Sequence, residues 1–123
     1  MTAKLTGDKG EKAALDYYLS NGYELADKNY RSDYGEIDII IKNSDYIVFA
    51  EVKTRNRKSL AKPSEFVDRR KRKRILMTAS IYLSENPTDL QPRFDVIEVI
   101  HDKNMSINHI ENAFCQSDDY AVF

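Results

Sequence analysis

Three residues with chemically useful side chains, Asp38, Glu51 and Lys53, lie within or beside two short apolar segments. Carboxylate oxygens are the ligands that Mg²⁺ and Mn²⁺ prefer in proteins. A lysine beside such a site adds a fixed positive charge that can be directed at a phosphate group. No histidine or cysteine pair with zinc-ligand spacing competes, because His101 and His109 are isolated. The residues therefore favour a divalent-metal site that handles a phosphodiester.

The same residues are expected to meet because the two apolar segments form a β-hairpin. Ile37–Ile41 and Tyr46–Val52 are rich in β-branched and aromatic residues, and Asn43-Ser44-Asp45 between them is typical of a turn. Pairing about the centre of this turn places Asp38 opposite Glu51, or one step from it.

Strand geometry also decides which side chains accompany the two acids. Residues two apart on a strand share a face, so Glu36 is expected beside Asp38 and Lys53 beside Glu51. Two opposed carboxylates repel each other by up to about 1 kcal/mol when exposed, and by more when buried. A lysine can neutralise one charge, and a divalent cation can neutralise both. The alternative is a surface hairpin whose ends carry ordinary solvated charges.

Charge is unevenly distributed along the chain, although the net charge is only −1. Residues 52–75 contain eleven Lys or Arg against two acids, whereas residues 76–123 contain two against eight. A polyanion would therefore meet the middle of the chain. The expected nucleic-acid contacts are Arg55, Arg57, Lys58, Arg70, Lys73 and Arg74.

Six of the eleven cations in residues 52–75 are consecutive, Arg69–Arg74, and lie on a predicted helix. Like charges four residues apart disfavour a helix by a few tenths of a kcal/mol, about 0.2–0.5 per pair, and a phosphate backbone would relieve that repulsion. Two alternatives stay open. One is a solvated helix face partly balanced by Glu65 and Asp68, and the other is a targeting signal.

The elements expected around the hairpin define an α/β fold in the order α-β-β-β-α-β, with a mixed central sheet flanked by helices. They are a helix over Thr6–Asn21, a strand over Tyr23–Arg31, the hairpin, a basic loop over Thr54–Pro63, a helix over Ser64–Leu83, a strand over Phe94–Ile100 and an edge strand over Met105–Phe114. Residues 1–115 form one expected domain, and residues 116–123 an acidic tail.

Composition places the chain among cytoplasmic proteins. The single cysteine, Cys115, cannot form an internal disulfide. No apolar run approaches the ~20 residues that span a bilayer, and Met1–Gly10 has no apolar segment typical of a signal peptide. Neither a membrane nor an oxidising compartment is expected.

The ordered motifs of residues 7–100 resemble one family of proteins. Gly35-Glu36-Ile37-Asp38, followed by Glu51-Val52-Lys53, looks like the PD-(D/E)xK signature of restriction-endonuclease-like nucleases. The flanking motifs resemble the YraN-like bacterial proteins, predicted nucleases related to archaeal Holliday-junction resolvases. These flanking motifs are Gly10-Glu11-Lys12-Ala13, Asn21-Gly22-Tyr23, Asn29-Tyr30-Arg31, Phe49-Ala50-Glu51-Val52-Lys53-Thr54-Arg55 and Arg93-Phe94-Asp95-Val96.

The resemblance implies a restriction-endonuclease-like core and a role for each site residue. Asp38 and Glu51 would ligate Mg²⁺ or Mn²⁺, with the Val52 carbonyl as a third ligand. Lys53 would position or activate the attacking water and hold the scissile phosphate, and Glu11 would supplement the site. One departure is that an isoleucine precedes Asp38 where the superfamily motif has proline.

The expected function is a metal-dependent endonuclease that hydrolyses phosphodiester bonds in DNA, on branched or flapped structures. The alternative is a nucleic-acid-binding module that keeps the fold with little or no catalysis. A homodimer is a further expectation, by analogy with enzymes that cut both strands of a symmetric junction.

Overall fold

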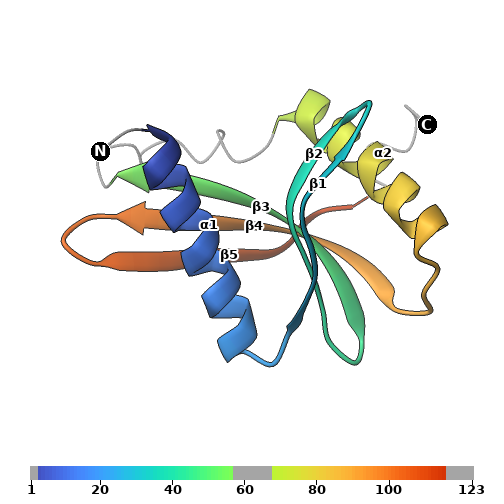
Figure 1. The fold of residues 1–123 in the computed structure, drawn as a ribbon, viewed down its shortest axis with the longest axis horizontal. Coiled ribbons are helices and arrows are strands. Elements are labelled where there is room, and N and C mark those ends of the chain that lie inside the picture. Colours follow the sequence, from blue (N-terminus) through green and yellow to red (C-terminus); the bar gives the residue numbers. More distant parts are fainter. Residues whose placement is uncertain (1–2, 57–67, 116–123) are drawn as a thin grey trace.

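The computed structural model describes residues 3–56 and 68–115, and the backbone alone for residues 3–6. Arg57, Lys58 and the expected tail at 116–123 lie outside the described residues. Within the described residues, two helices and five strands follow one another (Figure 1). Their bounds are α1 Ala3–Ser20, β1 Glu24–Ser32, β2 Gly35–Lys42, β3 Tyr46–Asn56, α2 Arg69–Glu85, β4 Gln91–His101 and β5 Met105–Phe114.

The five strands form one mixed sheet in the order β1-β2-β3-β4-β5. β3 and β4 run parallel, and the other neighbours run antiparallel. The expected α/β fold with a mixed central sheet is therefore confirmed, and the edge strand is real. No helix among the described residues has the length and apolar character needed to cross a membrane.

The two helices cover opposite faces of the sheet. Neighbouring residues of β3 show this, because Val48 packs in a core cluster with α1 residues such as Tyr18, whereas Phe49 packs in a second cluster with α2 residues such as Ile75. Successive strand side chains point to opposite faces, so the near-continuous apolar sequence of β3 supplies side chains to the cores on both faces.

Local signals explain where the helices end and begin. α1 ends at Ser20, two residues before Gly22, whose φ of 88° is left-handed, and the N–H of Tyr23 donates to the Tyr18 carbonyl across the helix end. α2 starts one residue after Asp68, whose carboxylate accepts the Lys71 N–H at 2.8 Å. α2 therefore begins at Arg69, and Ser64, the predicted start of this helix, lies outside the described residues.

The predicted basic loop over Thr54–Pro63 is wrong at its start. Residues 54–56 belong to β3, which pairs with β4 as far as Asn56 opposite His101. A parallel partner that lies far along the chain cannot be seen in a local sequence pattern. The remainder of the expected loop, residues 57–63, falls outside the described residues.

A buried ionic cluster fixes α1 and β5 to the centre of the sheet. The side chain of Asp95 is fully buried and accepts hydrogen bonds from Arg93, from the Tyr18 hydroxyl at 2.8 Å and from the Asn112 N–H at 2.9 Å. His109 Nε2 lies 2.7 Å from the same carboxylate. Burial alone would raise the pKa of Asp95, but these partners outweigh it and lower the pKa to about 2.

Arg93 is equally enclosed. Its guanidinium donates to the Tyr23 hydroxyl at 2.8 Å and to Asp95, lies 4.8 Å from the centroid of the Tyr46 ring and pairs with Glu111 at 2.9 Å. Its side chain is only 5% exposed. Arg93 is therefore part of the structural core and not a surface contact for phosphate.

Removal of the Asp95 carboxylate tests this cluster. Asp95→Ala should lower the free energy of unfolding by about 3–5 kcal/mol, because Arg93 would keep a buried charge without its main partner. Glu111→Gln is the matched control, since Glu111 is 60% exposed, and should cost less than ~1 kcal/mol. Urea unfolding at neutral pH measures both. The pKa of Asp95 in the folded state lies below the ordinary value of 3.8. Its contribution to the free energy of unfolding should therefore be full above pH 3.8 and fade toward about pH 2. Equal losses in both variants would contradict the account.

Candidate metal and nucleic-acid site

The hairpin of β2 and β3 has the register expected from its turn. Ile39 pairs with Ala50 and Lys42 with Ile47, so the next pair along the ladder would be Asp38 and Glu51. The pairing ends before that step. The two strands separate where the two acids lie, so strand pairing does not hold Asp38 opposite Glu51, but both side chains line the same pocket.

β2 changes the face on which its side chains pack at Asp38. Ile39 packs in the α1-side core, whereas Ile37, two positions earlier, packs in the α2-side core. On β1, Asn29 has a left-handed φ of 53° and falls between the paired residues Lys28 and Tyr30. The β1–β2 ribbon therefore turns away from β3 and toward α2, which opens one edge of the sheet (Figure 1).

Asp38 lies at the base of this opening. Its Oδ2 accepts a hydrogen bond from the Val52 N–H at 2.8 Å, which ties the carboxylate to β3. Burial and the nearby charge of Glu51 raise the pKa of Asp38 to about 7, against the smaller lowering effects of Val52 and Lys71. The carboxylate is thus held in a place where its negative charge is poorly stabilised.

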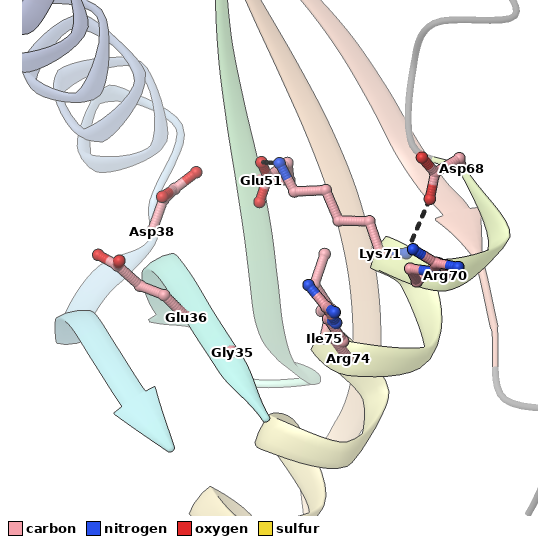
Figure 2. A pocket seen from close by; sticks show the side chains of 9 residues that line it. All are labelled: Gly35, Glu36, Asp38, Glu51, Asp68, Arg70, Lys71, Arg74 and Ile75. Carbon is pink, nitrogen blue, oxygen red and sulfur yellow. Dashed lines mark hydrogen bonds and ion pairs between the residues drawn. The ribbon is translucent and has the colours of Figure 1, made fainter. Parts of the chain in front are cut away.

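Glu51 faces Asp38 from β3 and is paired with a cation that sequence reasoning missed. The Glu51 side chain is 7% exposed, and Lys71 Nζ of α2 lies 2.5 Å from its Oε1 (Figure 2). Burial tends to lower the pKa of Lys71, but its bond with Glu51 outweighs burial and raises it. Spacing could have found this lysine, because Lys71 precedes the buried Ile75 by one helical turn and so points toward the sheet.

Lys53 is half-buried near the same charges. Its pKa is lowered, first by burial and then by Lys71 and Arg55, while Glu51 acts in the opposite direction. The close contact with Glu51 that is described above comes from Lys71. The role predicted for Lys53, toward a bound phosphate and water, stays a prediction.

Glu11 approaches the site from α1. The Asn29 amide, with its nitrogen directed at the acids, donates to Glu11 Oε1 and Glu36 Oε1, each at 3.2 Å. The pKa of Glu11 is raised by burial and by the charges of Asp8, Glu36 and Glu51. Glu36 shares the pocket with Asp38, as strand spacing predicted. The left-handed Asn29 therefore connects the helix acid to the hairpin.

The donor set at the opening suits a hard divalent cation. The Val52 N–H points to Asp38, and the N–H and carbonyl of one strand residue point to the same side, so the Val52 carbonyl faces the gap as well. Two carboxylates and one carbonyl result. No three His, Cys, Asp or Glu side chains gather into a metal cluster within residues 7–56 and 68–115. Mg²⁺ accepts such a small protein set, because it keeps water or phosphate oxygens as further ligands.

A pocket of about 390 Å³ joins these acids to the basic end of α2. Glu36, Asp38 and Glu51 line one side, and the other side carries Arg70 and Arg74 together with the capping acid Asp68 (Figure 2). A site with carboxylates on one wall and guanidinium groups on the opposite wall can hold a cation and an anion side by side.

The other predicted nucleic-acid contacts divide into two groups. Lys73 lies beside Arg70 and Arg74 in an adjoining pocket. Arg55 is different, since its side chain is 11% exposed and its Nε lies 3.0 Å from Glu98 on β4. In this conformation Arg55 supports the sheet beside Lys53 and does not reach outward.

Comparison with known proteins agrees with the motifs. The α/β architecture, with acids at the split between two strands of a mixed sheet, is consistent with a restriction-endonuclease-like core. A sequence model described as "Uncharacterised protein family UPF0102" matches residues 10–99. The chain belongs to the UPF0102 family, and its resemblance to the YraN-like proteins is confirmed.

Relatives match over nearly the whole chain. A UPF0102 protein of Clostridioides difficile (strain 630) is 49% identical over 115 residues, which cover 93% of this chain and 100% of the relative. One of Caldanaerobacter subterraneus subsp. tengcongensis is 42% identical over 116 residues, covering 90% and 95%. One of Thermodesulfovibrio yellowstonii is 44% identical over 108 residues, covering 88% and 94%.

The raised pKa of Asp38 predicts a stabilising substitution. In EDTA at pH 8, Asp38→Asn should raise the free energy of unfolding by about 1–3 kcal/mol, less than the unscreened ~4 kcal/mol that a rise from 3.8 to about 7 implies. The folded-state pKa lies above the unfolded value, so the gain should shrink below pH 7 and vanish near pH 3.8. Urea unfolding across this range measures it. Asp45→Asn, at an exposed acid of the β2–β3 turn, is the control, and a destabilised Asp38→Asn protein would contradict the electrostatics.

Proposed function

We propose that this protein is a metal-dependent endonuclease that hydrolyses phosphodiester bonds in DNA. The observation that carries the proposal is the placement of Asp38 and Glu51 at the split between β2 and β3, with arginines across the same pocket. Placing two acids side by side raises the free energy of the free protein, which is expected of a site that awaits a cation. The arginines opposite would bind the polyanion that brings the phosphate.

Asp38, Glu51 and the Val52 carbonyl would hold Mg²⁺ or Mn²⁺. When bound, the ion would neutralise charge on the phosphate and lower the pKa of a water molecule. Asp38 would give up its proton on binding, and its bond from the Val52 N–H would keep the carboxylate oriented. Glu51 would exchange its contact with Lys71 for the ion, which frees that ammonium group.

The two lysines then have distinct tasks. Lys53 would face the scissile phosphate, where its lowered pKa makes it a better proton donor than an ordinary lysine. Lys71, once released from Glu51, would neutralise a non-bridging phosphate oxygen or stay between the acid and the substrate. Glu11, held through Asn29, would accept a proton from water at the margin of the site.

A binding module without catalysis is the second candidate, and one contact favours it. The Lys71 ammonium already neutralises Glu51, and protonation near pH 7 already relieves Asp38. In that case the protein needs no ion and would use the basic end of α2 to hold DNA. A homodimer is compatible with either candidate.

Cleavage assays separate the two functions. End-labelled single-stranded, duplex, flapped and four-way DNA, incubated with Mg²⁺ or Mn²⁺, should be cut by the wild-type protein and not in EDTA. Asp38→Asn and Lys53→Ala should each lower the single-turnover rate by about 100-fold or more, because each removes charge stabilisation that the transition state needs.

Lys42→Ala is the matched control, since Lys42 is a half-exposed lysine at the far end of β2, the strand that carries Asp38, and pairs with exposed Glu24. It should cleave normally. DNA binding with no cleavage under any metal would establish the binding module. Cleavage that persists undiminished in Asp38→Asn and Lys53→Ala would refute this active site.

A further inference from the structure

The pocket of the acids continues into a second hollow of about 640 Å³. Gly35, Arg70 and Arg74 line both, so the two spaces meet at these residues and form one groove. The groove runs between α2 and the turn that joins β1 to β2. One end is acidic, and the other end is basic.

The side chains of the second hollow match the parts of a nucleotide. Arg70, Lys73 and Arg74 on α2 provide three positive charges, against one acid, Asp33, in the same lining. Tyr34 lies on the facing wall and is 48% exposed, one of few large apolar side chains on the described surface that are this accessible. Cations suit phosphates, and an exposed aromatic ring suits the face of a base.

The wall that carries Tyr34 is fixed in place. The Ser32 hydroxyl lies 2.8 Å from the hydroxyl of the buried Thr78 on α2, and the Tyr34 N–H donates to the same Ser32 oxygen at 3.0 Å. The backbone passes close to the helix at Gly35, where a β-carbon would lie 3.4 Å from Cβ of Arg74. The spacing between the turn and α2 is therefore set before any ligand arrives.

We infer that this hollow binds the nucleotides next to the scissile phosphate as an unpaired strand, with one base stacked on Tyr34. The inference rests on the proposed function, and it names the substrate as a single strand or the single-stranded arm of a branched molecule. Bases inside a duplex are covered on both faces by their neighbours, so only an unpaired base can offer its face to the ring. A space of about 640 Å³ is of the size that one or two nucleotides would fill.

Fluorescence anisotropy in EDTA tests the inference without any need for cleavage. The probes are fluorescein-labelled oligothymidylate of about 15 nucleotides and a blunt duplex of about 15 base pairs, both within or near the strand lengths that such grooves bind. Wild-type protein should bind the single strand more tightly than the duplex. Tyr34→Ala should weaken single-strand binding by about tenfold, the loss expected for one stacked base, and leave duplex binding unchanged.

Two variants sharpen the result. Tyr34→Phe keeps the ring and should bind the single strand as the wild type does, whereas Lys73→Gln should weaken both probes and reduce their salt dependence. Equal affinity for both probes, or a Tyr34→Ala protein that binds the single strand normally, would overturn the inference. If the wild type cleaves DNA but Tyr34→Ala binds the single strand normally, the inference fails and the proposed function stands. If single-strand binding depends on Tyr34 but no DNA is cleaved, the inference stands and the proposed nuclease activity fails.

Discussion

The repulsion between Asp38 and Glu51 is the interaction on which the rest of the site depends. Burial strengthens it, because little water is present to screen the two carboxylates. In the free protein Lys71 pairs with Glu51, and the Val52 N–H donates to Asp38. The pKa of Asp38 is raised to about 7, so protonation also relieves the repulsion. In the proposed function a divalent cation would take the place of the Lys71 contact and of the proton on Asp38, while the Val52 N–H would keep its bond to Asp38. The site is therefore a local instability that a ligand would remove.

The rest of the fold keeps that instability in place. The buried bonds of Asp95 hold α1 and β5 to β4, and the bond between Ser32 and Thr78 holds the β1–β2 turn to α2. With both faces of the sheet covered, β2 can leave β3 at Asp38 without unfolding the hairpin. The same departure forms the groove beside α2, so the acidic pocket and the basic hollow share one structural cause.

Sequence patterns were sufficient for the hairpin and its two acids, because a short turn determines strand register over the next few residues. They also predicted both helices and the mixed sheet. They were insufficient where distant segments meet. The contact of Lys71 with Glu51 depends on where α2 begins, and the pairing of Arg55 with Glu98 depends on a parallel strand neighbour. The left-handed Asn29, which joins Glu11 to Glu36, depends on an irregularity in strand pairing that no local pattern shows.

Crystals grown with Mn²⁺ would show whether Asp38 and Glu51 bind a metal, through the anomalous scattering of the ion. We expect one strong anomalous peak between the carboxylates of Asp38 and Glu51 and the Val52 carbonyl, about 2.0–2.3 Å from the ligand oxygens, with Lys71 moved off Glu51. A saturated crystal with no peak there, and with Lys71 still bonded to Glu51, would contradict the proposed metal site.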